Sequence, residues 1–111
     1  MNLVTNQPKV LATAQGNLTR LQMLMLDYTT AYMFSGNSLD VMHHRPIKVF
    51  AQIMNMTTSG SDYARIHKTF ERLKQPVLNL PDGKAPLFDN QSTCEQGVMN
   101  FRFSQEILKY Y

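Results

Sequence analysis

The sequence is poor in the features that cross-link small secreted proteins or place a chain in a membrane. Its single cysteine, Cys94, excludes an internal disulfide. No apolar run in the chain approaches the roughly 18 residues that a membrane-spanning helix requires. The opening residues, MNLVTNQPKVLATAQGN, lack a basic segment followed by an apolar one, which is the pattern of a secretory signal. We therefore expect a cytoplasmic protein without a membrane partner.

Motifs for catalysis and for metal or cofactor binding are also missing. The chain has no glycine-rich phosphate loop, no nucleophile motif and no patterned pair of acids. Two adjacent histidines, His43 and His44, rarely direct both rings at one ion, and Cys94 does not stand at a spacing typical of zinc ligands. We expect both histidines to be surface or core residues. The sequence thus predicts a protein that is not an enzyme and uses no metal and no cofactor.

The chain has the length and composition of one globular domain. With 111 residues, of which 43% are hydrophobic and 17% charged, it is long enough to bury a single core. We expect an N-terminal arm over residues 1–16 and one compact domain over residues 17–111.

Apolar periodicity and turn residues predict the order of the helices and strands. Spacings of three and four residues indicate helices, strict alternation indicates strands, and glycine and proline mark the turns between them. Together they predict an α+β winged helix, which combines a helix-turn-helix with a β-hairpin wing. The expected elements are a helix from an N-cap at Asn17 to Gly36, an edge strand over 38–41, a helix from Pro46, a helix over 62–74, a strand over 77–80, a turn over 81–83, a long hairpin loop over 84–97 with a short strand near Leu87 and Phe88, a strand over 98–103 with Met99, Phe101 and Phe103 on one face, and a helical turn capped by Ser104.

Positive charge is concentrated in the middle of the chain. The net charge of +3 is modest. Residues 41–75 have a net charge of +4, whereas the net charge is zero over residues 1–40 and −1 over residues 76–111. A local excess of this kind is a candidate surface for an anionic partner. The lysines and arginines of the middle third are Arg45, Lys48, Arg65, Lys68, Arg72 and Lys74.

The helix expected over 62–74 gathers several of these cations on one face. At about 100° per residue, Arg65, Lys68, Thr69 and Arg72 fall within an arc of about 100°. Such a face is most often only solvated, but this helix follows another helix and precedes strands, which is the position of a helix that enters the major groove of DNA. The predicted DNA-binding residues are Arg65, Lys68, Thr69, Arg72, Arg45 and Lys48.

Three segments resemble the winged-helix replication initiator (Rep) proteins of bacterial plasmids. They are GNLTRLQMLMLDYTTAY, the stretch from SLDVMHHRP to ERLKQPVLNL, and GVMNFRFSQEILKYY. The resemblance implies a protein that binds repeated origin sequences in double-stranded DNA, recruits host replication proteins and dimerises. It also implies that the third helix, with Arg65, Lys68, Thr69 and Arg72, faces the DNA.

A second interpretation is a winged-helix interaction module or inhibitor that contacts protein instead of DNA. Its basis is the low total charge, the eight methionines and a second apolar face on the helix over 17–34, since methionine adapts to irregular partner surfaces. A continuous basic patch from Arg65 to Arg72 would favour DNA. A large exposed apolar patch would favour protein.

Overall fold

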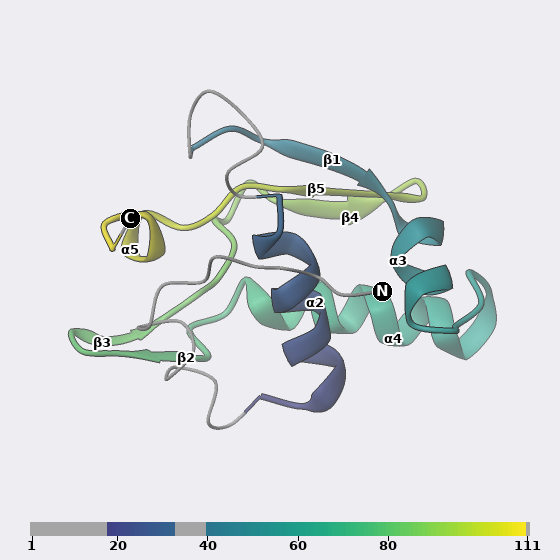
Figure 1. The fold of residues 1–111 in the computed structure, drawn as a ribbon, viewed down its shortest axis with the longest axis horizontal. Coiled ribbons are helices and arrows are strands. Elements are labelled where there is room, and N and C mark those ends of the chain that lie inside the picture. The colour runs from purple at the N-terminus through teal and green to yellow at the C-terminus, as the bar shows by residue number, and fades with distance from the viewer. Residues whose placement is uncertain (1–17, 33–39, 111) are drawn as a thin grey trace.

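The computed structural model describes residues 18–32 and 40–110, which form short strands and helices around one core (Figure 1). This mixed α+β architecture agrees with the class predicted from the sequence. In chain order the elements are α2 (Arg20–Thr30), β1 (His43–Pro46), α3 (Ile47–Ile53), α4 (Gly60–Leu73), β2 (Leu78–Leu80), β3 (Gly83–Ala85), β4 (Thr93–Glu95), β5 (Val98–Phe101) and α5 (Gln105–Leu108).

The strands form two separate antiparallel sheets. In the larger sheet β5 lies between β1 and β4, and its residue Asn100 is paired with His44 on one side and Thr93 on the other. Strands β4 and β5 are joined by Gln96 and Gly97, whose φ angles of 52° and 75° suit a tight hairpin turn. Strands β2 and β3 form the second sheet alone.

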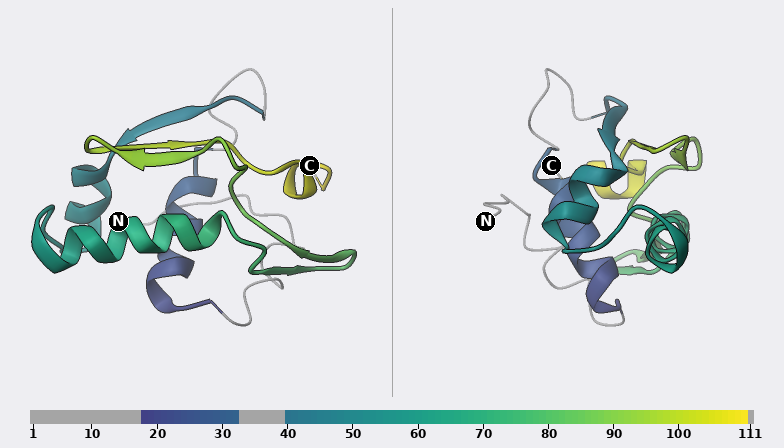
Figure 2. Two further views of the ribbon diagram at one scale, coloured as in Figure 1. Left: turned by 180° about the vertical axis from the view of Figure 1, so that it is seen from behind. Right: turned by 90° about the vertical axis from the view of Figure 1, so that its right-hand side faces the viewer.

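Helices α2 and α4 form a packed pair, and the two sheets lie on different sides of this pair. Helix α2 crosses α4 and packs against it, and the three-stranded sheet lies on one side of this helix pair (Figures 1 and 2). The β2–β3 hairpin leaves the C-terminal end of α4 and projects away from the larger sheet (Figure 2). One exposed face of α4 is therefore flanked by α2 and by this hairpin.

Aromatic rings from α4, from β5 and from segments beside β5 meet in the core. As the alternation in the sequence predicts, Met99, Phe101 and Phe103 are buried. The Phe88 ring stacks on Phe70 of α4 with centroids 4.7 Å apart and lies 5.6 Å from the Phe101 ring. Sheet and helix are thus joined through one continuous group of rings.

The single cysteine is part of this interior. Cys94 lies on β4, an edge strand of the larger sheet, and is buried. Burial, followed by the nearby charge of Glu71, raises the pKa of its thiol to about 11. The side chain is therefore a neutral thiol at physiological pH.

The first helix begins later and ends earlier than the sequence predicts. Thr19 is its N-cap: the Thr19 hydroxyl accepts a hydrogen bond from the Gln22 backbone N–H at 3.2 Å, and the Gln22 side chain accepts one from the Thr19 N–H at 3.0 Å. This reciprocal capping box satisfies two free N–H groups at the helix start, so the helix starts there and Leu18 lies outside it. Helix α2 ends at Thr30. Asn17 and Gly36 lie outside the described residues.

The edge strand predicted over 38–41 is also misplaced. Asp40 and Val41 are not in a strand, and β1 begins at His43, while residues 38 and 39 lie outside the described part of the chain. The strand is set by its pairing with β5, which places His43 opposite Phe101. Pro46 ends this strand and caps α3, so it precedes the first helical turn that it was expected to occupy.

The long hairpin loop predicted over 84–97 is wrong. This segment contains the end of β3 and all of β4, and the strand expected near Leu87 and Phe88 is only an isolated bridge between Phe88 and Phe103. Strands of three residues are too short to show an alternation that sequence periodicity could detect. The turn predicted over 81–83 is confirmed at residues 81 and 82, whereas Gly83 already belongs to β3. The helical turn after Ser104 is also confirmed.

Buried His43 should make the stability of the domain depend on pH. Its ring stacks on Phe101 with centroids 5.3 Å apart, and its pKa is lowered from 6.5 by burial, then by the charges of Arg45 and His44. Below about pH 6.5 the unfolded chain therefore binds more protons than the folded one, so the stability is complete above that pH and falls as the pH drops through it.

Urea unfolding between pH 7.5 and 5.5 tests this prediction. We expect His43→Leu to flatten the pH dependence of the unfolding free energy. His67→Gln, which removes an exposed histidine, should retain the pH dependence that His43 causes. An equal pH dependence in wild type and His43→Leu would contradict the prediction.

Candidate nucleic-acid interface

Helix α4 is oriented by the turn that joins it to α3. Gly60 begins the helix with a φ of 59°, a conformation that glycine adopts without strain. In the first turn the Asp62 carboxylate accepts hydrogen bonds from the Thr57 backbone N–H at 2.9 Å and from the Thr57 hydroxyl at 3.2 Å. These bonds lower the pKa of Asp62. The carboxylate thus fixes the loop to the start of the helix.

The two faces of α4 are those that the sequence predicts. Apolar side chains of the helix, Ile66 and Phe70 among them, are buried in the core. Arg65, Lys68 and Arg72 are exposed on the opposite side. Since burial fixes the apolar face, the rotation of the helix and the direction of its cations are also fixed.

A groove of about 690 Å³ runs between this cationic face and the N-terminal half of α2. On the α4 side it is lined by Arg65, Lys68 and Arg72, and on the α2 side by Arg20. Of the residues that the structure describes, Glu71 is the only carboxylate along this groove. Four cations from two helices therefore converge on one open groove, an arrangement that can bind several anionic groups at once.

A second hollow of about 300 Å³ extends the groove toward the β2–β3 hairpin. The two hollows share Thr19, Gln22 and Arg72 in their walls, and the second is also lined by Lys84 of β3. A fifth cation from a third element thus stands at the end of the groove.

Ion pairs within the domain neutralise only part of this charge. The Arg65 guanidinium lies 3.8 Å from the Asp62 carboxylate, and both side chains are partly exposed. Glu71 lies 3.6 Å from Lys74. Among the residues that the structure describes, Lys68 and Arg72 form no ion pair with a carboxylate. These two side chains remain available to an anionic partner.

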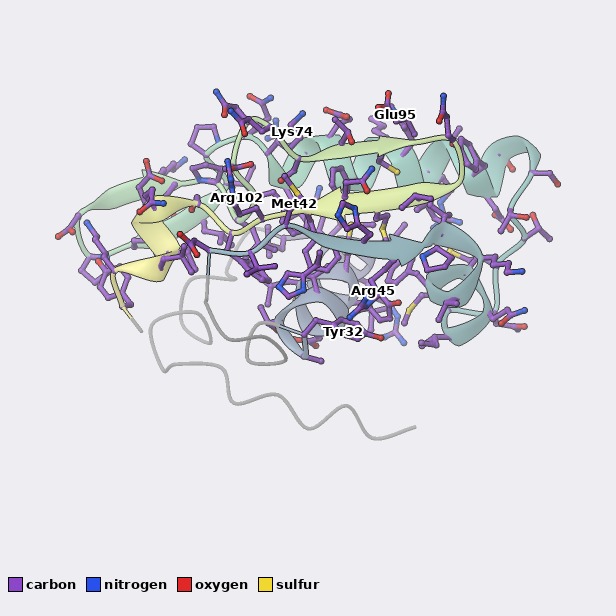
Figure 3. All side chains as sticks on the ribbon, turned by 90° about the horizontal axis from the view of Figure 1, so that it is seen from above. Tyr32, Met42, Arg45, Lys74, Glu95 and Arg102 are labelled. Atoms are coloured by element: carbon purple, nitrogen blue, oxygen red, sulfur yellow. The ribbon has the colours of Figure 1, made fainter. Side chains whose placement is uncertain are left out.

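The other predicted DNA-binding residues are placed differently. Thr69 also lines the groove, but it is only 8% exposed and its hydroxyl donates to the Arg65 carbonyl at 2.7 Å. Arg45 lies on β1 with its guanidinium 4.1 Å from the centroid of the Tyr32 ring (Figure 3). Lys48 is exposed on α3, and neither Arg45 nor Lys48 lines the two hollows.

Arg20 and Lys84 are the cations that sequence reasoning missed. Both belong to parts of the chain that have no net positive charge, and only the tertiary structure brings them beside α4. One local feature does set Arg20 apart, because it is a cation at the first residue of its helix. The helix dipole disfavours a cation there, which suggests a role outside helix stability.

A comparison with known protein families shows the class of protein to which the chain belongs. Residues 4–111 match the family described as Initiator Replication protein, WH1, so the chain belongs to this winged-helix family of replication initiators. The resemblance that the sequence shows is thereby confirmed at the level of the family. No match was found among curated proteins. None of the helices that the structure describes is long and apolar enough to cross a membrane.

Proposed function

We propose that this domain binds double-stranded DNA, at the repeated sequences of a plasmid or phage replication origin, through the basic groove beside α4. The observation that carries the proposal is the convergence of Arg20, Arg65, Lys68 and Arg72 on one open groove. Duplex DNA is a dense array of phosphates, and cations that neutralise them release counterions and supply most of the nonspecific affinity. Arginine can in addition read the edge of a guanine in the major groove.

The order of elements supports α4 as the DNA-facing helix. It follows α3 after a short turn in which Thr57 is hydrogen-bonded to Asp62, and two helices joined by a short turn are the order of elements in a helix-turn-helix. The β4–β5 hairpin, closed by Gln96 and Gly97, follows in the chain at the position of a wing. We assign it that role.

The exposed apolar surface does not favour the alternative, a module that acts through protein contacts. Among the residues that the structure describes, Val41 is the one large hydrophobic side chain that is exposed. A protein-binding surface usually has a contiguous apolar centre. The resemblance also implies a homodimer and a contact with host replication proteins. Both stay predictions.

A single substitution in the groove tests the proposal. Lys68→Ala should weaken binding to all duplexes alike and flatten the slope of log affinity against log salt concentration by about 0.9, because one phosphate contact is lost. The readout is fluorescence anisotropy with a labelled duplex over a salt series.

Lys48→Ala is the matched variant, since it also removes one exposed lysine but lies outside the groove. This variant tests whether Lys48 of α3 makes the DNA contact that the sequence predicts. A wild-type protein that binds no duplex at low salt, or a Lys68→Ala variant with an unchanged slope, would overturn the proposal.

A further inference from the structure

The β2–β3 hairpin holds a cation at the end of the basic groove. Leu78, Leu80 and Ala85 are its buried side chains, whereas Lys84 and its cross-strand partner Asn79 are exposed. Lys84 lines the hollow that continues the groove from Arg72 onward. The hairpin forms no hydrogen-bonded pair with the larger sheet in the part of the chain that the structure describes, so other contacts must fix its position.

The base of the hairpin is fixed to α4. Strand β2 follows this helix after a short turn, and beyond β3 the backbone N–H of Leu87 donates to the carbonyl of Leu73, the last residue of α4, at 2.9 Å. The same Leu87 accepts a hydrogen bond through its carbonyl from the Ser104 N–H at 2.9 Å. Chain entry and exit are therefore held at the C-terminal end of the helix that carries the groove.

The tip of the hairpin is held by the end of the domain. Asp82, in the turn between β2 and β3, forms an ion pair with the Lys109 ammonium group. The Tyr110 hydroxyl donates to the same carboxylate oxygen at 3.3 Å. We call these contacts of Asp82 with Lys109 and Tyr110 the latch. It connects the residues after α5 to the hairpin that carries Lys84.

We propose that the β2–β3 hairpin is a second DNA-contacting element, in which Lys84 binds the phosphate backbone of the duplex held against α4 and the latch positions the hairpin. The inference rests on the proposed function. A phosphate contact fits better than a base contact, because lysine is a flexible point charge without the fixed geometry that reads a base edge. The surface that Lys84 extends is cationic, so charge complementarity selects DNA as its occupant.

Substitutions of Lys84 test the contact itself. Lys84→Ala should flatten the salt dependence of duplex binding by about 0.9 in log–log slope, whereas Lys84→Arg should retain the wild-type slope. Asn79→Ala is the folding control, because it alters the same exposed face of the hairpin without changing the charge. An unchanged slope for Lys84→Ala, measured by fluorescence anisotropy, would overturn the inference.

Two substitutions with opposite effects on charge test the latch. Asp82→Asn removes a negative charge and Lys109→Gln removes a positive one, so a purely electrostatic role would strengthen binding in the first variant and weaken it in the second. A positioning role predicts weaker binding in both, by up to about fivefold, which is the range of an exposed ion pair. In a Lys84→Ala background the loss caused by Asp82→Asn should disappear. If DNA binding is stronger in Asp82→Asn and weaker in Lys109→Gln, the latch does not position the hairpin.

The same experiment separates this inference from the proposed function. If Lys68→Ala flattens the salt slope and Lys84→Ala does not, the groove of α4 binds DNA and the hairpin does not. If the wild-type protein binds no duplex, the proposed function fails and the hairpin contact fails with it. Circular dichroism of each variant confirms that the fold is intact.

Discussion

Replacing Arg65, Lys68 and Arg72 together by alanine is expected to flatten the salt dependence of duplex binding by about 2.7 in log–log slope. Each lost phosphate contact removes the release of about 0.9 counterions. Between about 50 and 200 mM salt the affinity of the wild type should therefore fall about 40-fold more than that of the variant. All three side chains are exposed, so the unfolding free energy should change by only about 0.5 kcal/mol per site.

A charge-preserving variant is the matched control. Arg65→Lys combined with Arg72→Lys keeps every positive charge on α4 and should retain the wild-type slope. If either arginine reads a guanine, this variant should instead lose about 1–3 kcal/mol of discrimination at one base pair, because lysine cannot form the two parallel hydrogen bonds. A triple alanine variant that binds duplex DNA like the wild type over the salt series would favour the protein-interaction module.

Phe101→Ala should lower the free energy of unfolding by about 3–5 kcal/mol, the range for removing a large buried aromatic side chain. Phe101 is fully buried and its ring lies against those of Phe88, Phe103 and His43. The substitution would leave a cavity between the larger sheet and α4. Urea denaturation followed by circular dichroism measures the change.

The neighbouring position on the same strand provides the control for this prediction. Asn100 is on the opposite face of β5, where its amide N–H donates to the Thr93 hydroxyl at 3.1 Å and its side-chain oxygen lies 2.5 Å from His44 Nδ1. Asn100→Ala should therefore cost only about 1–2 kcal/mol, the net value of two hydrogen bonds. A loss below about 1 kcal/mol for Phe101→Ala would show that this ring does not hold the core together.

The elements that could be predicted are those whose signal is local. Helix α4 has an apolar face and a charged face over fourteen residues. The segment 98–103, which forms β5 as far as Phe101, alternates buried and partly exposed residues without interruption. Ser104 caps α5 by accepting a hydrogen bond from the Ile107 N–H, a pattern that serine before a helical turn indicates. In each case neighbouring residues contain enough information to fix the structure.

The features that could not be predicted depend on partners far away in the chain. Strand β4 has only three residues and exists because β5 pairs with it. Strand β1 contains two histidines and an arginine in place of an apolar alternation, so its place in the sheet is set by β5 as well. The groove has the same origin, since Arg20 and Lys84 are 64 positions apart and only folding brings both to α4.

The buried thiol of Cys94 gives the domain a built-in reporter of local opening. A thiol reagent attacks the thiolate of an accessible cysteine, and this side chain is neither ionised at neutral pH nor accessible in the folded sheet. Modification therefore requires β4 to separate from its neighbours, and the reaction rate measures how often the edge of the sheet frays. Because the chain has a single cysteine, every modified molecule records that one event.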